Sequence, residues 1–388
     1  MEILPQTQQQ LLYLISCALH ETAPEDAILG DIQWNQLFSA ARAHSVCAMV
    51  CMALERTKTF AQADPEVRKQ WLDAKNKAVR KNMLLDTDRE RLMEKMEQAQ
   101  IWHMPLKGSI LKDWYPRCGM REMADNDILF DPARREQVRD IFLSLGYSVE
   151  HYQGGNHDVY RKPPVYNFEM HVALFHEGVY EQLAKKYANV KDKLLPDQGK
   201  PYRFHFTQED FYVFVLTHAH KHYSHSGTGI RTLTDLYVMN RKIGQTLNWD
   251  YVNQELEALG IRDYETGSRT LAEKLFGSET PVSEFTLTEQ EQEMLLYYLG
   301  SSTYGNFENR ITNQLHSIQA DGKPISGFTK FKYCMTRLFP GRNWCKLPYP
   351  FIYRHPCLLP AFWIWRLWDR LASNGKDIWK ELFTVKSS

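Results

Sequence analysis

Apolar residues recur with two different spacings along the chain, and the changes of spacing divide it into three parts. Over residues 1–95 they recur every three or four positions, as in the segments that begin at Leu11 and Leu85, which predicts amphipathic helices. Short alternating segments follow, and after about residue 205 the helical spacing returns. The sequence therefore predicts an α+β fold in three domains: a helical region (1–95), a small sheet with helices (96–205) and a second helical region (206–388).

The middle part has the element order of a compact unit of strands and helices. A brief helix is expected within 108–116, and a longer helix is expected at 132–147. Strands are expected in four segments: 121–130, 147–152, 157–162 and 166–175. Elements in this order pack as a layer of sheet against a layer of helices.

The last part is expected to be helical up to about residue 300. Helical spacing is present at 208–223, 231–243 and 288–300, and Gly300 is a plausible stop signal. Residues 320–360 are rich in proline, glycine and aromatic residues, which predicts irregular structure. The chain has no internal repeat and no low-complexity tract.

The charge balance and the cysteines exclude several classes of protein. The chain has 47 Lys and Arg and 47 Asp and Glu, whereas a protein that grips long nucleic acids usually has a basic surplus. The seven cysteines are scattered without a CxxC pair, so neither a zinc ribbon nor a disulfide framework is expected. Free thiols are typical of the reducing cytoplasm, where we expect the protein.

We expect no targeting segment and no membrane-spanning segment. The first twenty residues contain an apolar run without a basic leader or a cleavage site, as in an amphipathic helix. No stretch reaches the roughly 18 uncharged apolar residues that a spanning helix requires.

Two aspartates one residue apart, Asp125 and Asp127, stand in the predicted strand 121–130. Residues two apart in a strand point to the same face, about 6.6 Å apart along its axis. Two carboxylates so placed raise each other's pKa unless a cation lies between them, and Mg²⁺ suits such a pair. The alternative is that both carboxylates lie at a solvated end of the strand.

Two neighbouring segments favour the metal. The strand 166–175 alternates, so that Asn167, Glu169 and His171 lie on its polar face, where Glu169 can provide a third carboxylate. Lys107, Gly108 and Ser109 stand at the junction of a short apolar segment and a helix, where free backbone N–H groups and a lysine can bind phosphate.

The order of Gly-Ser, Asp-x-Asp and a third acidic residue resembles the polymerase-beta-like nucleotidyltransferase superfamily. More closely, "PLKGSILKDWYP", "REMADNDILF", "YNFEMH", "HKHY" and "GTGIRTLTDLYV" look like a bacterial family of uncharacterised nucleotidyltransferases, over roughly residues 80–240. The third acidic residue is Glu where many relatives have Asp, and fifteen residues (110–124) separate the Gly-Ser pair from the aspartates, a longer gap than in compact members.

The resemblance implies a nucleotidyltransferase-type sheet and a role for each of these residues. Asp125, Asp127 and Glu169 would be the catalytic carboxylates, and they would hold Mg²⁺, or Mn²⁺. The Gly108–Ser109 turn would grip a nucleoside triphosphate, with Lys107 beside it.

A histidine run lies on the predicted helix 208–223 and just beyond it. His218, His222 and His225 have i, i+4 and i+7 spacing, which could hold zinc, but no Glu stands where a zinc protease needs one. The alternative is a helix face that contacts the nucleotide or a neighbouring domain, and the resemblance supports it.

The same region supplies two cations for the triphosphate. The triphosphate carries excess negative charge, which needs cations opposite the carboxylates. Lys221 and Arg231 are therefore expected to point into the same cleft as the aspartates, and arginine can bind phosphate with two hydrogen bonds. Asp235 is expected to orient Arg231 or to cap local structure.

The segment "LPAFWIWRLWDRLASNG" (359–375) is rich in tryptophan, with Phe362, Trp365 and Trp368 at near-helical spacing. One interpretation is a helix that lies on a membrane surface or on a partner. The other is a terminal helix that packs on the protein, with arginine stems at its rim.

Together these features predict a Mg²⁺-dependent nucleotidyltransferase that moves a nucleoside monophosphate from a nucleoside triphosphate such as ATP to a hydroxyl acceptor. The acceptor, a small molecule or a protein or peptide, is not specified by the sequence. A non-catalytic nucleotide-binding module of the same fold and phosphoryl transfer from ATP stay as alternatives.

Overall fold

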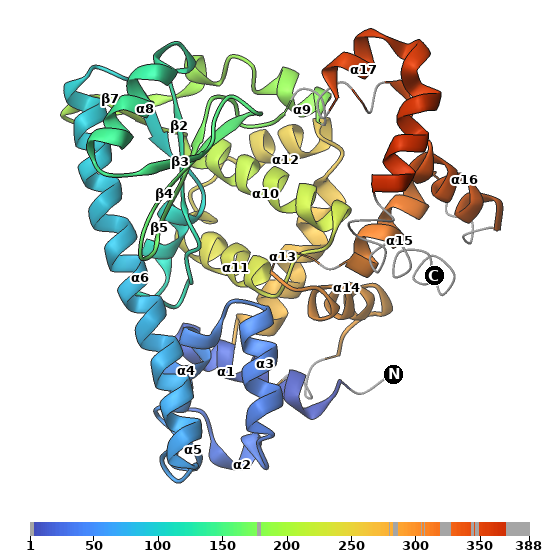
Figure 1. The fold of residues 1–388 in the computed structure, drawn as a ribbon. Helices are drawn as coiled ribbons and strands as arrows, with labels where there is room; N and C mark the ends of the chain where they lie inside the picture. Colours follow the sequence, from blue (N-terminus) through green and yellow to red (C-terminus); the bar gives the residue numbers. More distant parts are fainter. Residues whose placement is uncertain are drawn as a thin grey trace. The chain divides into compact units, whose positions relative to one another are not determined.

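The computed structural model describes residues 4–176, 180–278, 280–281, 286–303, 305, 307–318, 327–342, 345 and 349–369 (Figure 1). The chain divides into two compact units. The first unit comprises Met1–His220 and Gly229–Thr303, and the second comprises Lys221–Thr228 and Tyr304–Ser388.

The N-terminal part is helical, as predicted. Its helices are α1 (Gln6–His20), α2 (Asp26–Leu29), α3 (Trp34–Ala43), α4 (Cys47–Leu54), α5 (Lys58–Ala61) and α6 (Pro65–Gln98). The long helix α6 begins with a proline that needs no hydrogen-bond partner there, behind Asp64, whose side chain accepts from the N–H of Glu66. In Figure 1 it extends from the N-terminal helices along the sheet, so it belongs to both parts of the fold.

Within the described residues seven strands form one mixed sheet in the order β3-β4-β5-β2-β1-β7-β6. The strands are β1 (His103–Pro105), β2 (Asn126–Phe130), β3 (Ser148–His151), β4 (His157–Lys162), β5 (Tyr166–His171), β6 (Leu195–Asp197) and β7 (Lys200–His205). The four predicted strand segments each contain one of these strands. The β6–β7 hairpin was not predicted, because its prolines and its glycine turn (Gly199, φ 74°) interrupt any alternation.

One face of the sheet is sealed by α6 and by α8 (Arg135–Ser144). The core between them includes Phe142, which stacks on Tyr160 with ring centroids 4.0 Å apart, and Phe168 and Met170 of β5. The predicted alternation of β5 is therefore confirmed, since its apolar residues enter this core. The polar residues Asn167, Glu169 and His171 alternate with these apolar residues along β5, so they lie on the other face of the sheet.

Short helices and turns complete the first half: α7 (Gly108–Leu111), η1 (Lys112–Trp114), η2 (Pro132–Arg134), α9 (Glu181–Lys186) and η3 (Val190–Lys193). Helices follow: α10 (Gln208–His225), α11 (Arg231–Ile243), α12 (Trp249–Ala258), α13 (Arg262–Phe276) and α14 (Glu289–Gly300). The second unit contains α15 (Phe307–Ile318), α16 (Gly327–Leu338), α17 (Pro350–Arg354), η6 (Pro356–Leu358) and helical residues 359–369.

The predicted helices at 208–223, 231–243 and 288–300 are confirmed. The expectation of irregular structure over 320–360 is wrong for α16, where Phe328 and Phe331 have helical i, i+3 spacing. It is also wrong for α17, which begins at Pro350, because proline suits the first position of a helix. Residues 319–326 and 370–388 lie outside the described residues.

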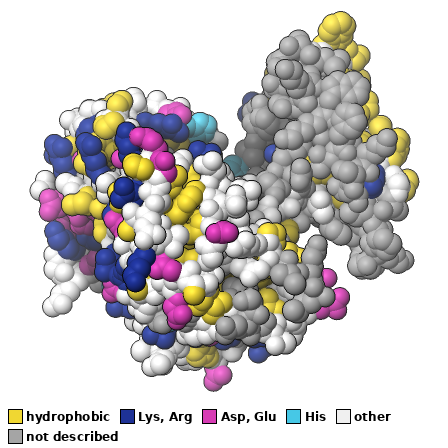
Figure 2. All heavy atoms as spheres, turned by 90° about the horizontal axis from the view of Figure 1, so that it is seen from below, with side chains coloured by type: hydrophobic (Ala, Val, Ile, Leu, Met, Phe, Trp, Pro, Cys, Tyr) yellow, Lys and Arg dark blue, Asp and Glu magenta, His cyan; other side chains and the backbone are white. Residues whose placement is uncertain are grey.

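No helix among the described residues is long and apolar enough to cross a membrane. All seven cysteines are described, and all are free thiols. Charged side chains of both signs are interspersed on the face of the molecule that Figure 2 shows.

Three side chains of the first unit, those of Arg121, Tyr115 and His44, hold α11 and its N-terminal end. Arg121, in the segment before β2, makes a paired contact with Asp235 of α11: Nε to Oδ1 is 2.7 Å and Nη2 to Oδ2 is 2.9 Å. The Tyr115 hydroxyl donates to the same carboxylate (2.7 Å). At the start of α11, the buried His44 ring accepts from the N–H of Ile230 (3.3 Å).

We predict that Asp235→Ala destabilises the fold by about 3–5 kcal/mol, because it leaves the guanidinium of Arg121 buried without its counter-charge. Arg121→Leu combined with Asp235→Ala should recover part of this loss. Urea unfolding measures both, and Asp140→Ala, at an exposed surface pair, is the control with an expected change below about 1 kcal/mol. If Asp235→Ala and Asp140→Ala destabilised the fold equally, Asp235 would not be the counter-charge that stabilises the buried Arg121.

We also predict an acid-dependent loss of stability from His44. Burial lowers its pKa from 6.5 to about 4, although a backbone hydrogen bond with Leu299 opposes this. The unfolded chain takes up a proton near pH 6.5 and the folded chain does so only near pH 4, so stability falls as the pH is lowered through this window.

The loss from this residue should be about 2–3 kcal/mol at pH 4.5. Urea unfolding of His44→Gln should show a smaller loss between pH 7 and 4.5 than the unaltered chain, with the exposed His205→Gln as control. A pH dependence unchanged by His44→Gln would exclude this source.

Candidate active site

The helix α6 holds the segment that leads into β2. Lys81 Nζ donates to the carbonyl of Ala124 (2.8 Å), and Asn82 Nδ2 donates to the carbonyl of Arg121 (2.9 Å). The fully buried Asn126, which opens β2, accepts from the Arg89 guanidinium (3.1 Å). The backbone on both sides of Asp125 is therefore fixed by one long helix.

The carboxylates of β2 and β5 lie side by side. Asp127 and Glu169 are register partners in these parallel strands, so their side chains point to the same face. His171, two residues beyond Glu169, lies on that face too, and its Nε2 is 2.8 Å from Asp127 Oδ1 and 3.9 Å from Glu169 Oε2. One potential ligand atom from each of the three residues lies within 4.8 Å of the others.

Lys107 brings a positive charge to this cluster. Its Nζ is 3.2 Å from Asp127 Oδ2 and 3.1 Å from Nε2 of His218 on α10. Its backbone is in the left-handed half of φ/ψ space (φ 37°, ψ −102°), a conformation that costs a non-glycine residue about 1–3 kcal/mol. The turn between β1 and α7 is strained where it directs this ammonium group to the carboxylate.

The two aspartates have opposite pKa shifts. Burial disfavours ionisation of Asp127, but Lys107 and His171 hold its pKa well below the usual value. Burial raises the pKa of Asp125 to about 6, with further contributions from the charges of Asp127 and Glu169. Asp125, one residue before β2, therefore interacts electrostatically with Asp127 and Glu169. It does not belong to the group of three residues whose ligand atoms converge.

Arg231 opens α11 on the same side as Asp125. Its guanidinium donates to the carbonyl of Glu122 (3.1 Å), and its charge lowers the pKa of Asp125. The expectation that Asp235 orients it is wrong, because the Asp235 carboxylate contacts Arg121 instead. Lys221 belongs to the second unit, so its predicted role stays a prediction.

The Gly108–Ser109 turn is closely packed. A side chain at Gly108 would place its Cβ 2.6 Å from Arg121 Nη1, so the guanidinium requires glycine there. Ser109 is buried, and both its hydroxyl (2.8 Å) and its N–H (3.2 Å) donate to the carbonyl of Leu106. Phosphate binding by this turn stays a prediction, and it would have to involve groups other than these two donors.

His171 belongs to the cluster, although it was not among the predicted site residues. The alternation of β5 placed it on the polar face with Glu169, which was the available signal. His157 is its register partner on β4, with ring centroids 5.1 Å apart and Nε2 3.9 Å from Glu169 Oε2. Among the described residues, the group of three potential metal ligands is Asp127, Glu169 and His171. The histidines from His218 to His225 form no such group there.

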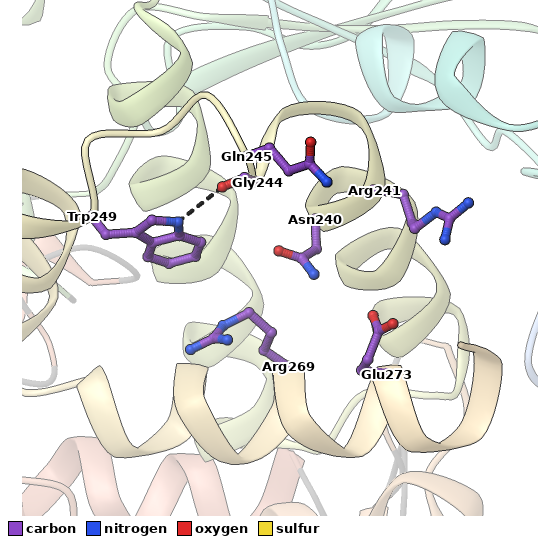
Figure 3. Close-up of a pocket in the computed structure, with 7 residues that line it drawn as sticks. All are labelled: Asn240, Arg241, Gly244, Gln245, Trp249, Arg269 and Glu273. Carbon is purple, nitrogen blue, oxygen red and sulfur yellow. Dashed lines mark hydrogen bonds between the residues drawn. The ribbon is translucent and has the colours of Figure 1, made fainter. Parts of the chain in front are cut away.

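A separate pocket lies at the other end of α11. It has a volume of about 560 Å³ and is lined by residues of α11, α13, the start of α12 and the loop before it: Asn240, Arg241, Gly244, Gln245, Trp249, Arg269 and Glu273 (Figure 3). Trp249 donates to the carbonyl of Gly244 (2.9 Å), and Arg269 lies over the indole (4.9 Å). Arg231 and Asn240 are nine positions apart on α11, about 14 Å along the helix, so the pocket is distinct from the carboxylate cluster.

Comparison with known proteins identifies the family of the chain. A model of the family described as "Uncharacterised nucleotidyltransferase" matches residues 30–277, a range that includes the sheet, the carboxylate cluster and α11. No curated protein and no solved structure matches the chain. The matched range covers more than half of the sequence, and the chain therefore belongs to this family of uncharacterised nucleotidyltransferases.

Proposed function

We propose that the protein transfers a nucleoside monophosphate from a nucleoside triphosphate to a hydroxyl acceptor, with a divalent metal held at the carboxylate cluster. The observation that carries the proposal is the convergence of Asp127, Glu169 and His171 beside Lys107, in a chain of a nucleotidyltransferase family.

The donor set fits a divalent metal. Ligands on adjacent octahedral positions of an ion with bonds of about 2.1 Å lie about 3 Å apart, close to the 2.8 Å between His171 Nε2 and Asp127 Oδ1. Two carboxylates suit Mg²⁺ and Mn²⁺, and the imidazole nitrogen shifts the preference towards Mn²⁺. When bound, the metal would neutralise phosphate charge and activate a hydroxyl.

The surrounding residues have complementary roles in this proposal. Asp125 would complete the metal site, as the family resemblance implies. Lys107 and Arg231 would face the phosphates, because both cations already lie close to the aspartates. The acceptor oxygen would bond to the α-phosphorus in line, the bond to pyrophosphate would break, and the hydroxyl proton would pass to a carboxylate of the site.

Labelled ATP tests the reaction class. Purified protein with Mg²⁺ or Mn²⁺ and candidate acceptors should incorporate label from the α-phosphate and release pyrophosphate. Label from the γ-phosphate alone would instead support phosphoryl transfer. Absence of nucleotide binding by calorimetry, across all four nucleoside triphosphates and both metals, would reject the proposal.

We predict that Asp127→Asn weakens Mn²⁺ binding by at least about tenfold, because it removes a ligand charge at the centre of the cluster. Electron paramagnetic resonance of free Mn²⁺ measures this without requiring activity. His171→Gln should also weaken binding and should remove nitrogen coupling from the spectrum of the bound ion. Asp140→Asn, at an exposed site on α8, is the control, and an effect as large as that of Asp127→Asn would indicate non-specific binding.

We predict that Arg231→Ala weakens binding of a non-hydrolysable ATP analogue by about 1.5–3 kcal/mol, the value of a hydrogen bond to a charged group. Arg241→Ala, at the exposed far end of the same helix, is the matched control and should bind normally. Calorimetry measures the affinities, and thermal unfolding checks that both variants are folded. Equal affinity of the two variants would remove Arg231 from the phosphate site.

A further inference from the structure

The second unit exposes more large apolar side chains than the first. Among the described residues, all five exposed Phe and Trp side chains belong to it: Phe328, Phe331, Phe351, Trp365 and Trp368. The exposed large hydrophobic residues of the first unit are single aliphatic or methionine side chains on separate elements. In Figure 2 hydrophobic side chains lie on the surface of the second unit.

The exposed residues form a stripe on each of two helices. On α16, Phe328, Phe331 and Met335 have i, i+3 and i+7 spacing and are 75%, 61% and 38% exposed. Thr329 and Tyr333, on the opposite side of α16, are buried. This helix therefore packs by one face and presents an apolar stripe on the other.

Residues 359–369 repeat this arrangement. Ile364, Trp365 and Trp368 are 62%, 51% and 73% exposed, whereas Phe362 and Arg366 on the opposite side are buried. The buried guanidinium of Arg366 donates to the carbonyl of Arg337 on α16 (2.7 Å), which ties the two helices together.

The charge of this region is strongly positive. Residues 327–388 contain eleven Lys and Arg and three Asp and Glu, in a chain whose net charge is zero. Basic residues attract the anionic headgroups of a bilayer, and tryptophan and phenylalanine insert at the level of the headgroups. The stripes also contain Ile364 and Met335, which are neither aromatic nor basic. These side chains favour a lipid surface over a nucleic acid, which binds aromatic and basic groups.

We propose that α16 and residues 359–369 form a docking surface for an anionic lipid bilayer. The two apolar stripes enter the headgroup layer, and the basic residues around them contact lipid phosphates. Docking would hold the nucleotidyltransferase unit at a membrane without a spanning helix. The proposal is independent of the reaction proposed above, since it concerns residues outside the matched family range.

Vesicle sedimentation of the full chain tests this proposal without nucleotide. The protein should bind vesicles of phosphatidylcholine with phosphatidylglycerol at least about tenfold more tightly than vesicles of phosphatidylcholine alone, and salt should weaken this binding. Tryptophan fluorescence should shift to shorter wavelength and be quenched by brominated lipid.

Two variants and one control define the surface. Trp365→Ala with Trp368→Ala should reduce binding at least about tenfold. Lys332→Glu with Arg354→Glu, at exposed positions, reverses two charges and should do the same, which keeps the test decisive if the tryptophan variant does not fold. Leu143→Ala with Leu195→Ala, at exposed apolar positions of the first unit, should bind as the unaltered chain.

Three results would overturn the proposal. The first is equally weak binding to both kinds of vesicle. The second is self-association in sedimentation equilibrium that is lost when Trp365 and Trp368 are replaced. The third is quenching of tryptophan fluorescence by RNA but not by brominated lipid.

Discussion

The candidate site depends on the cost of placing three carboxylates near one another in a half-buried space. Asp127 is stabilised as an anion by Lys107 and His171, while Asp125 next to it has a raised pKa because burial and two neighbouring charges oppose its ionisation. Perturbed carboxylates are typical of functional sites, so these opposite pKa shifts support the proposal that the cluster binds a divalent cation.

The rest of the first unit supports this cluster. The helix α6 seals one face of the sheet with apolar residues near its C-terminal end. Nearer its N-terminus, Lys81 and Asn82 fix the backbone around the aspartates. The pair of Arg121 and Asp235 connects that segment to α11, whose first residue is Arg231. Lys107, which has a strained backbone conformation, contacts Asp127 from the turn before α7. Contacts from several elements of the first unit thus position the residues of one polar cluster.

The sequence predicted most of the helices and strands, because their apolar periodicity is local. It predicted Asp127 and Glu169 on one face from the alternation of two strands. It could not predict that His171 contacts Asp127, because that contact depends on the register of β2 and β5, which no local pattern specifies. For the same reason the sequence could not show that the Asp235 carboxylate contacts Arg121, 114 residues away. It suggested only local roles, which were to orient Arg231 on the same helix or to cap local structure. The roles of Lys221, Gly108 and Ser109 stay predictions that rest on the family resemblance.

The most direct measurement is anomalous diffraction from crystals soaked with Mn²⁺ and a non-hydrolysable ATP analogue. We expect a manganese peak bounded by Asp127, Glu169 and His171, with an α-phosphate oxygen among its ligands and Lys107 and Arg231 against the phosphates. A peak elsewhere, or nucleotide bound in the pocket at the far end of α11 with no metal at the carboxylates, would contradict it.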